Sequence, residues 1–310
     1  MAPEHHTPAP EPPPGAPEPA AEAPEPTAGA SGVSGRVGRE GKAGRREKVE
    51  EPVPVLPVDV FDSHCHLDML EMTVAEAVAE AQAVGVRRIM TIGCDLPSSQ
   101  WAAATAAEHP DVYAGVAIHP NDTKGLTGET LERIAALARE PQVVAVGETG
   151  LDYYRDHSSR EDQQRSFRAH IAIAKDTGKA LVIHDREAHE DVLRILAEEG
   201  APEKVVFHCF SGDAAMARVC SDRGYVMSFA GNVTFKNAQP LRDALAVAPL
   251  DLVLVETDAP FMAPVPRRGK PNASHLIPFT VRLMAEVKGV TVEELCEAIA
   301  ATGFRLFGMR

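Results

Sequence analysis

Eight short hydrophobic runs recur along the chain, and each is continuous rather than alternating with polar positions. A continuous apolar run is typical of a strand that is buried on both faces of a parallel sheet. The segments between the runs place apolar residues at helical spacing, as Phe167, Ile171 and Ala174 do in a helix that we expect to end near Gly178. The eight runs are VDVFDSH, RRIMTIG, YAGVAIHP, VVAVGE, ALVIHD, KVVFHC, YVMSFAG and DLVLVETD.

Three of the predicted helices begin with a hydroxyl three positions before a glutamate, which is the pattern of a capping box. The hydroxyls belong to Thr73, Ser158 and Thr291. Eight strands that alternate with helices in one domain predict an α/β fold of the (β/α)8 TIM-barrel class. An open doubly wound sheet is the alternative, although no GxGxxG sequence follows the first run, as a dinucleotide-binding version would require.

The first 57 residues are rich in Pro and Ala and contain few large apolar side chains. Such a segment cannot bury enough surface to offset the entropy of ordering. We therefore expect residues 1–57 to form a disordered tail and linker, and residues 58–310 to form one barrel domain. The tail lacks the basic start and apolar core of a secretion signal, and no apolar run approaches the ~20 residues that cross a bilayer.

The net charge indicates how the protein could bind DNA, and the cysteine content indicates the redox state of its thiols. The chain has a net charge of −14, and its first 57 residues carry 9 acidic and 6 basic residues, so the barrel has a net charge of −11. A protein that coats long DNA nonspecifically is usually basic, which excludes that role but not a site that grips one chain end. Five widely spaced cysteines without a CxxC pair indicate reduced thiols. We expect a cytoplasmic monomer with no membrane partner.

Polar side chains end five of the eight predicted strands. In a (β/α)8 barrel, the carboxyl ends of all the strands meet on the rim that carries the chemistry. Residues at alternate positions of an extended segment point to the same face, so the two histidines of FDSHCHLD are expected to converge. The six potential metal ligands on this rim are His64, His66, Glu148, His184, His208 and Asp258.

Imidazole and carboxylate groups without a thiolate suit Zn, Mn, Fe or Mg with open water positions. Six ligands exceed the needs of one catalytic ion, so we expect two divalent ions, Mg, Mn or Zn, bridged by Glu148. Cys65 and Cys209 each adjoin a ligand histidine. Their side chains should point to the opposite face of the strand, so we interpret them as core residues.

Several stretches resemble the TatD-related deoxyribonucleases, a family of the metal-dependent amidohydrolase superfamily. They include FDSHCHLD, GVAIHP, VGETGLDYY, FHCFSG, SFAGNVTFKNA and ETDAP, and the resemblance extends over nearly all of residues 59–310. The same six residues match the divalent-metal ligands of that family. The chain departs from the family pattern in RRGKPNASHLIP and in TGFRLFG, which affects the details of the substrate-end pocket and not the metal centre.

The resemblance implies a metal-dependent DNase that acts as a 3′–5′ exonuclease on DNA 3′ ends, preferentially single-stranded. Asp258 would be both a metal ligand and the general base, with Glu148 as the second catalytic carboxylate. For substrate binding we predict Arg186, two residues after a ligand, together with His119 and Lys236. Further phosphate-binding candidates are Arg155, Arg267 and Lys270.

Two other functions remain open at the level of sequence. The superfamily also hydrolyses amides and esters, and some relatives deacylate mischarged tRNA. Many binuclear members bridge their metals with a modified lysine from strand four, whereas strand four here offers Glu148, which favours the DNase-like branch. A non-catalytic metal-binding adaptor is the third hypothesis, although an adaptor would not need Asp258 as a base.

Overall fold

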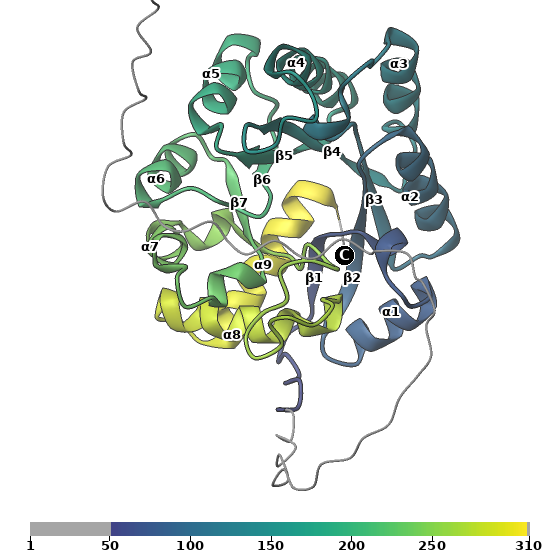
Figure 1. Cartoon of the computed structure of the whole chain (residues 1–310). Coiled ribbons are helices and arrows are strands. Elements are labelled where there is room, and N and C mark those ends of the chain that lie inside the picture. The colour runs from purple at the N-terminus through teal and green to yellow at the C-terminus, as the bar shows by residue number, and fades with distance from the viewer. Residues whose placement is uncertain (1–50, 309–310) are drawn as a thin grey trace, which may run out of the picture. The chain divides into compact units, whose positions relative to one another are not determined.

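The computed structural model describes residues 51–308, so most of the predicted disordered tail lies outside the described residues. Eight parallel strands form one sheet in which each strand pairs with the next in chain order (Figure 1). Each of the eight hydrophobic runs of the sequence overlaps one of these strands. The strands are β1 (Val60–Cys65), β2 (Val86–Gly93), β3 (Val112–Val116), β4 (Val143–Asp152), β5 (Ala180–Arg186), β6 (Val205–Phe207), β7 (Val226–Phe229) and β8 (Val253–Val255).

The sheet curls until its first and last strands meet. Just beyond the end of β8, the Asp258 amide donates to the carbonyl of His64, with a nitrogen–oxygen distance of 2.9 Å. The His66 amide donates in turn to the carbonyl of Ala259 at 2.8 Å, and Cys65 forms a parallel bridge with Ala259. The predicted (β/α)8 barrel is therefore confirmed, and the alternative of an open sheet is wrong.

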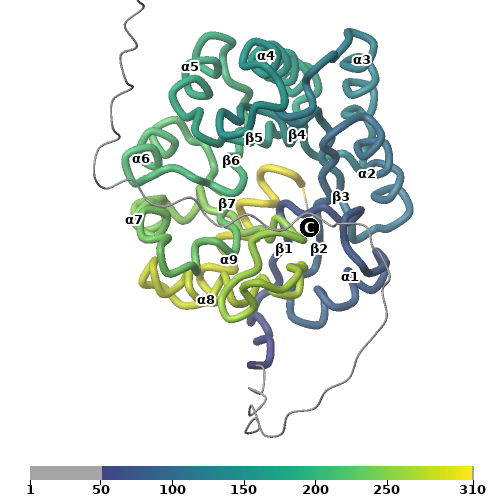
Figure 2. The backbone as a smooth tube through the Cα atoms, viewed as in Figure 1, coloured from purple at the N-terminus to yellow at the C-terminus, as the bar shows by residue number. Residues whose placement is uncertain are grey.

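Helices surround the barrel and alternate with its strands, as the smooth trace shows (Figure 2). The helices are α1 (Val74–Gln82), α2 (Leu96–Glu108), α3 (Gly128–Leu137), α4 (Arg160–Thr177), α5 (His189–Glu199), α6 (Ala214–Asp222), α7 (Gln239–Val247), α8 (Ile277–Lys288) and α9 (Val292–Phe307). Short 3-10 helices lie in the connections: η1 (Leu67–Met69), η2 (Pro120–Asp122), η3 (Gly231–Thr234), η4 (Leu250–Leu252) and η5 (Ser274–Leu276).

Two of the three predicted capping boxes are confirmed, at Thr73 and Thr291. The third is wrong, because α4 is capped by Ser159, whose hydroxyl accepts from the Asp162 amide. Ser158 is buried instead, and its hydroxyl donates to a backbone carbonyl of the η2 connection. The predicted end of α4 is confirmed, with Gly178 in the left-handed conformation that ends helices readily (φ 67°).

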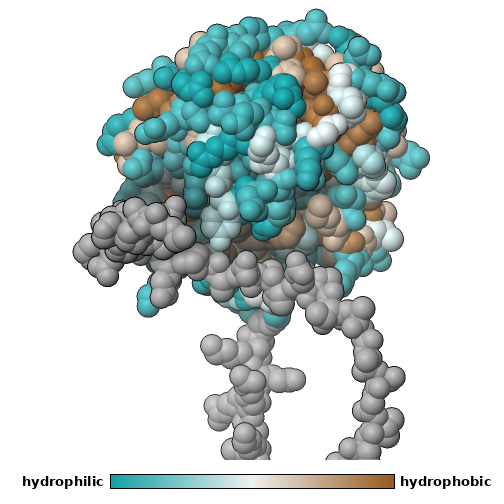
Figure 3. Space-filling view, turned by 45° about the horizontal axis from the view of Figure 1, so that its top comes forward, coloured by the Kyte–Doolittle hydropathy of each residue, from teal (hydrophilic) through white to brown (hydrophobic). Residues whose placement is uncertain are grey.

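The strands are buried on both faces, inside by the barrel core and outside by the helices. The last helix, α9, covers the first strand: the rings of Phe61 and Phe307 pack edge to face with centroids 6.2 Å apart. The outer face that Figure 3 presents is mainly hydrophilic, with hydrophobic side chains in separate patches. Within residues 51–308, no helix combines the length and apolar composition that are needed to cross a membrane.

Residues 51–57, which we assigned to the tail, contain one residue of the hydrophobic core. Leu56 is 6% exposed, and its amide donates to the carbonyl of Val84 at 3.0 Å. The folded unit therefore includes Leu56, two residues before the start that the composition suggested.

Candidate metal centre

The six side chains predicted to bind metal lie together at the carboxyl end of the barrel. Glu148 occupies the middle of the group and contacts four histidines. Its Oε2 atom lies 2.7 Å from Nε2 of His208 and 3.3 Å from Nδ1 of His184. The same oxygen lies 3.8 Å from Nε2 of His64, and Oε1 lies 3.7 Å from Nε2 of His66.

Asp258 completes one side of the cluster. Its Oδ1 atom is 3.5 Å from Nε2 of His66 and 3.9 Å from Nε2 of His64. His64, His66 and Asp258 form one group of donors, and the nitrogens of His184 and His208, 3.4 Å apart, belong to a second. Glu148 contacts both groups, which adjoin, since the His64 and His208 rings stack with centroids 3.9 Å apart. Two ligands of one ion at about 2.1 Å lie about 3–3.5 Å apart, which is close to the observed separations.

The local backbone explains how β4 can bring a carboxylate into this position. Gly150 has a φ of 143°, a region that disfavours other residues. A Cβ atom there would lie only 2.1 Å from the carbonyl oxygen of His184, so a side chain would push β4 away from β5. On the other side, Asp258 also has a positive φ of 54°, held by its hydrogen bond to β1. Non-glycine residues in this conformation are uncommon and collect at functional sites.

Two buried carboxylates that the sequence analysis missed orient the histidines of the second group. Glu256 is fully buried, and its Oε1 atom lies 3.2 Å from Nδ1 of His208 and accepts from the Cys209 amide at 2.7 Å. Asp152 lies 3.2 Å from Nε2 of His184. A carboxylate on one ring nitrogen fixes the orientation of the imidazole and directs the other nitrogen toward a metal.

Cys94 is a third side chain that the sequence analysis missed. It follows β2, and its Sγ atom lies 3.4 Å from Oε1 of Glu148 and 3.8 Å from Nδ1 of His66. Its position directly after a strand was the available signal, since the other donors share it. The cluster therefore contains a thiol, contrary to the expectation of imidazole and carboxylate donors alone. Cys65 is buried in the core, as predicted, whereas the same prediction is wrong for Cys209, which is only partly buried and lies outside the hydrophobic core.

The donor set fits a divalent metal. Both ring nitrogens of His64 are buried without a hydrogen-bond partner among the described residues, and burial holds its pKa well below the usual value. A neutral imidazole with an unpaired lone pair is the form that binds metal. Burial favours a raised pKa for Glu148, but the nearby His208 and His119 hold it well below its usual range. Glu148 is therefore anionic at neutral pH, the form in which a carboxylate binds a metal.

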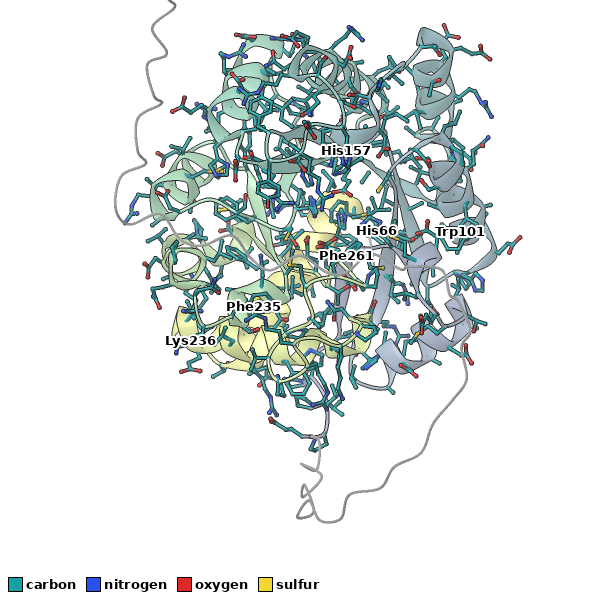
Figure 4. All side chains as sticks on the ribbon, in the orientation of Figure 1. His66, Trp101, His157, Phe235, Lys236 and Phe261 are labelled. Atoms are coloured by element: carbon teal, nitrogen blue, oxygen red, sulfur yellow. The ribbon has the colours of Figure 1, made fainter. Side chains whose placement is uncertain are left out.

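The predicted substrate-binding residues lie at different distances from this cluster. His119 is adjacent to it, with Nε2 3.4 Å from Nδ1 of His184. Arg186 ends β5, and its guanidinium stacks 3.8 Å above the ring of Tyr154. Lys236 is exposed and lies near α7, away from His66 at the barrel opening (Figure 4). The structure thus brings His119 to the metal donors and does not bring Lys236 there.

A cavity of about 550 Å³ lies beside the cluster, in the loop between β4 and α4. Asp152, which contacts His184, forms part of its wall, and Arg155 and His157 line it as well. Of the remaining phosphate-binding candidates, Arg267 is half-buried and packs over the Phe279 ring, and Lys270 is exposed in the same loop.

A (β/α)8 barrel with these donors on its carboxyl rim has the architecture of a metal-dependent hydrolase. The chain belongs to the TatD related DNase family, whose model matches residues 61–308. It is a metal-dependent hydrolase of that family.

The relatives of known sequence and structure agree with this assignment. A Mycobacterium tuberculosis protein described as the uncharacterized metal-dependent hydrolase TatD is 42% identical over 257 residues, covering 80% of this chain and 97% of that protein. The uncharacterized metal-dependent hydrolase YcfH of Escherichia coli K12 is 41% identical, covering 79% and 94%. The crystal structure of YjjV, a TatD homologue from Escherichia coli K12, has a TM-score of 0.77 at 28% identity, covering 81% and 98%.

Proposed function

We propose that this hydrolase is a DNase that removes nucleotides from the 3′ end of single-stranded DNA. The observation that carries the proposal is the position of Glu148 between two groups of buried donors, which suits a pair of divalent ions. Paired ions are typical of enzymes that cleave phosphodiesters. The family description names DNase activity, and the resemblance of the sequence motifs implies the same substrate.

In this proposal, six residues hold two divalent ions: His64, His66, Asp258, Glu148, His184 and His208. When bound, the ions lower the pKa of water and offset negative charge on the phosphate. Asp258 accepts the proton of the attacking water, because its side chain is 13% exposed whereas that of Glu148 is only 6% exposed. Glu256 and Asp152 keep the His208 and His184 rings in place while the charge on the phosphate changes.

Cationic groups beside the cluster would position the DNA backbone. Arg186 is the first candidate, since Tyr154 holds its guanidinium at the end of β5. Arg155 and His157 line the cavity beside Asp152 and could contact the neighbouring phosphate. His119 is close enough to His184 to contact either the substrate or that ring.

The test combines metal analysis with turnover. Purified protein is stripped of metal and titrated with Mg²⁺, Mn²⁺ or Zn²⁺, and metal content is measured at each step. Single-stranded DNA labelled at the 3′ end and at the 5′ end is then incubated with each form. We expect the 3′ label to be released as a mononucleotide while the 5′-labelled strand shortens stepwise. Release of internal fragments would contradict exonuclease action, and metal binding without any DNA cleavage would contradict nuclease activity.

A further inference from the structure

Large apolar side chains that remain exposed gather at one end of this protein. Among residues 51–308, seven are exposed, and five of these follow strands β1, β4 and β8 at the end of the barrel that carries the metal centre. Exposed apolar groups at a hydrolase opening indicate contact with apolar parts of a substrate. The five are Met69, Tyr154, Phe261, Met262 and Val265.

Phe261 stands closest to the metal donors in this set. Its ring centroid lies 6.3 Å from that of His66, with the two planes at 69°, and 49% of the residue is exposed. Figure 4 shows the two side chains together at the barrel opening. The Phe261 ring therefore lies next to a proposed metal ligand, while about half of the residue stays exposed to solvent at the barrel opening.

Hydrogen bonds hold the backbone that carries this ring. The Phe261 amide donates to the carbonyl of Asp258 at 2.8 Å, and the buried Asn272 side chain donates to the carbonyls of Thr257 and Phe261 at 2.8 and 2.6 Å. Gly231 allows the loop to pack closely, because a Cβ atom there would lie 2.0 Å from the carbonyl oxygen of Met262. A backbone that is already ordered loses little conformational freedom when a ligand stacks on the side chain that it carries.

Tyr154 and Phe261 differ in whether a cationic side chain covers one face of the aromatic ring. The Arg186 guanidinium covers the Tyr154 ring at 3.8 Å. No cation–π partner of Phe261 is found among the described residues. Phe261 is therefore the aromatic side chain of this opening that is best placed to receive a flat ligand.

We propose that the Phe261 ring is a stacking platform for a nucleobase next to the scissile phosphodiester, an inference that rests on the nuclease activity proposed above. Bases of any sequence have a flat π face, so stacking on an aromatic ring binds single strands with little sequence preference. A base within a duplex is already paired with the other strand and stacked on its neighbours, so it must be freed before it can stack on a protein ring. The platform thus selects substrates whose terminal bases are free, and it accounts for recognition of single strands by an acidic protein.

The test compares substrates that differ only in one base. A single-stranded oligonucleotide is made with all its bases, and two variants replace one or the other nucleotide flanking the 3′-terminal phosphodiester with an abasic residue. Wild-type protein, Phe261→Ala, Phe261→Trp and the control Phe304→Ala are compared on all three by kcat/KM and by metal content. Phe304 is a suitable control because it is 45% exposed and lies on α9, outside the proposed binding machinery.

We expect the wild-type protein to prefer the complete strand over one abasic strand by about 5- to 150-fold, the usual worth of stacking one base. Phe261→Ala should remove this preference, whereas Phe261→Trp and Phe304→Ala should keep it. If Phe261→Ala lowers kcat/KM equally on all three strands, or keeps the preference for the complete strand, the stacking proposal is wrong. The proposed nuclease activity would still stand in either case. A metal-loaded wild-type protein that cleaves none of the strands would end both proposals.

Discussion

Removing the negative charge of Glu148 should affect metal binding more than removing that of Asp258. The Glu148 carboxylate lies within 4 Å of a ring nitrogen in each of four histidines, two in each half of the cluster. Asp258 approaches the nitrogens of only two, both in the first half. Glu148→Gln therefore perturbs both halves, whereas Asp258→Asn perturbs one and leaves an oxygen in place.

The magnitudes follow from these roles. If Asp258 is the general base, its replacement by Asn should lower kcat by about 10²–10⁴, which corresponds to about 3–5.5 kcal/mol of transition-state stabilisation. Its metal content should stay near that of the wild type. Glu148→Gln should lower both the rate and the occupancy of the two metal positions, and excess metal should restore part of the rate.

The assay titrates metal into each variant and measures bound metal together with the rate on single-stranded DNA. Near-normal turnover of Asp258→Asn would show that the assigned base is wrong. If both variants lose metal to the same extent and recover equally with excess metal, Asp258 is a ligand only, and His119 becomes the next candidate for the base.

Three further outcomes are expected. A chain that starts at Glu51 should keep the thermal stability of the full chain, whereas a chain that starts at Val58 should melt earlier, because it lacks the buried Leu56, a loss typically worth about 2–5 kcal/mol. Burial lowers the pKa of His170 to about 4 from 6.5, so the unfolded chain binds the proton first as the pH falls. The folded state should lose about 2 kcal/mol from this residue between pH 7 and pH 5, and denaturant titrations should show that His170→Gln reduces the loss. Glu256→Gln should weaken metal affinity about 10- to 100-fold by releasing the His208 ring, and unchanged affinity in a metal titration would contradict that role.

The sequence predicts the strands and the six proposed ligands of this site, because the hydrophobic pattern and the positions of polar residues at strand ends are enough to identify them. Continuous apolar runs identify the eight strands, and polar residues at their ends identify the donors that the barrel brings together. His64 and His66 illustrate the point, since alternate positions of one extended strand place both rings on the same side.

The residues that the sequence analysis missed depend on contacts between distant segments. Glu256 and Asp258 are two positions apart, and strand alternation alone would place them together. Both residues follow the end of β8, and the structure places Glu256 beside His208 and Asp258 beside His66, a difference that the strand pattern does not reveal. The helix cap was assigned to Ser158 instead of its neighbour because the tertiary hydrogen bonds of Ser158 leave no trace in the local pattern.

The barrel closes where β1 pairs with the segment that follows β8, and this closure determines when the donor cluster can be completed during synthesis. His64 and His66 are synthesised near the start of the barrel domain. Asp258, which lies beside both of them in the structure, is synthesised almost 200 residues later. At about 5–20 residues per second, this interval lasts roughly 10–40 seconds. A nascent chain therefore lacks one of the proposed ligands throughout this time, and the donor cluster is complete only when the barrel has closed around its own last strand. A chain whose synthesis stops before residue 258 lacks the carboxylate that lies beside His64 and His66 in the complete barrel.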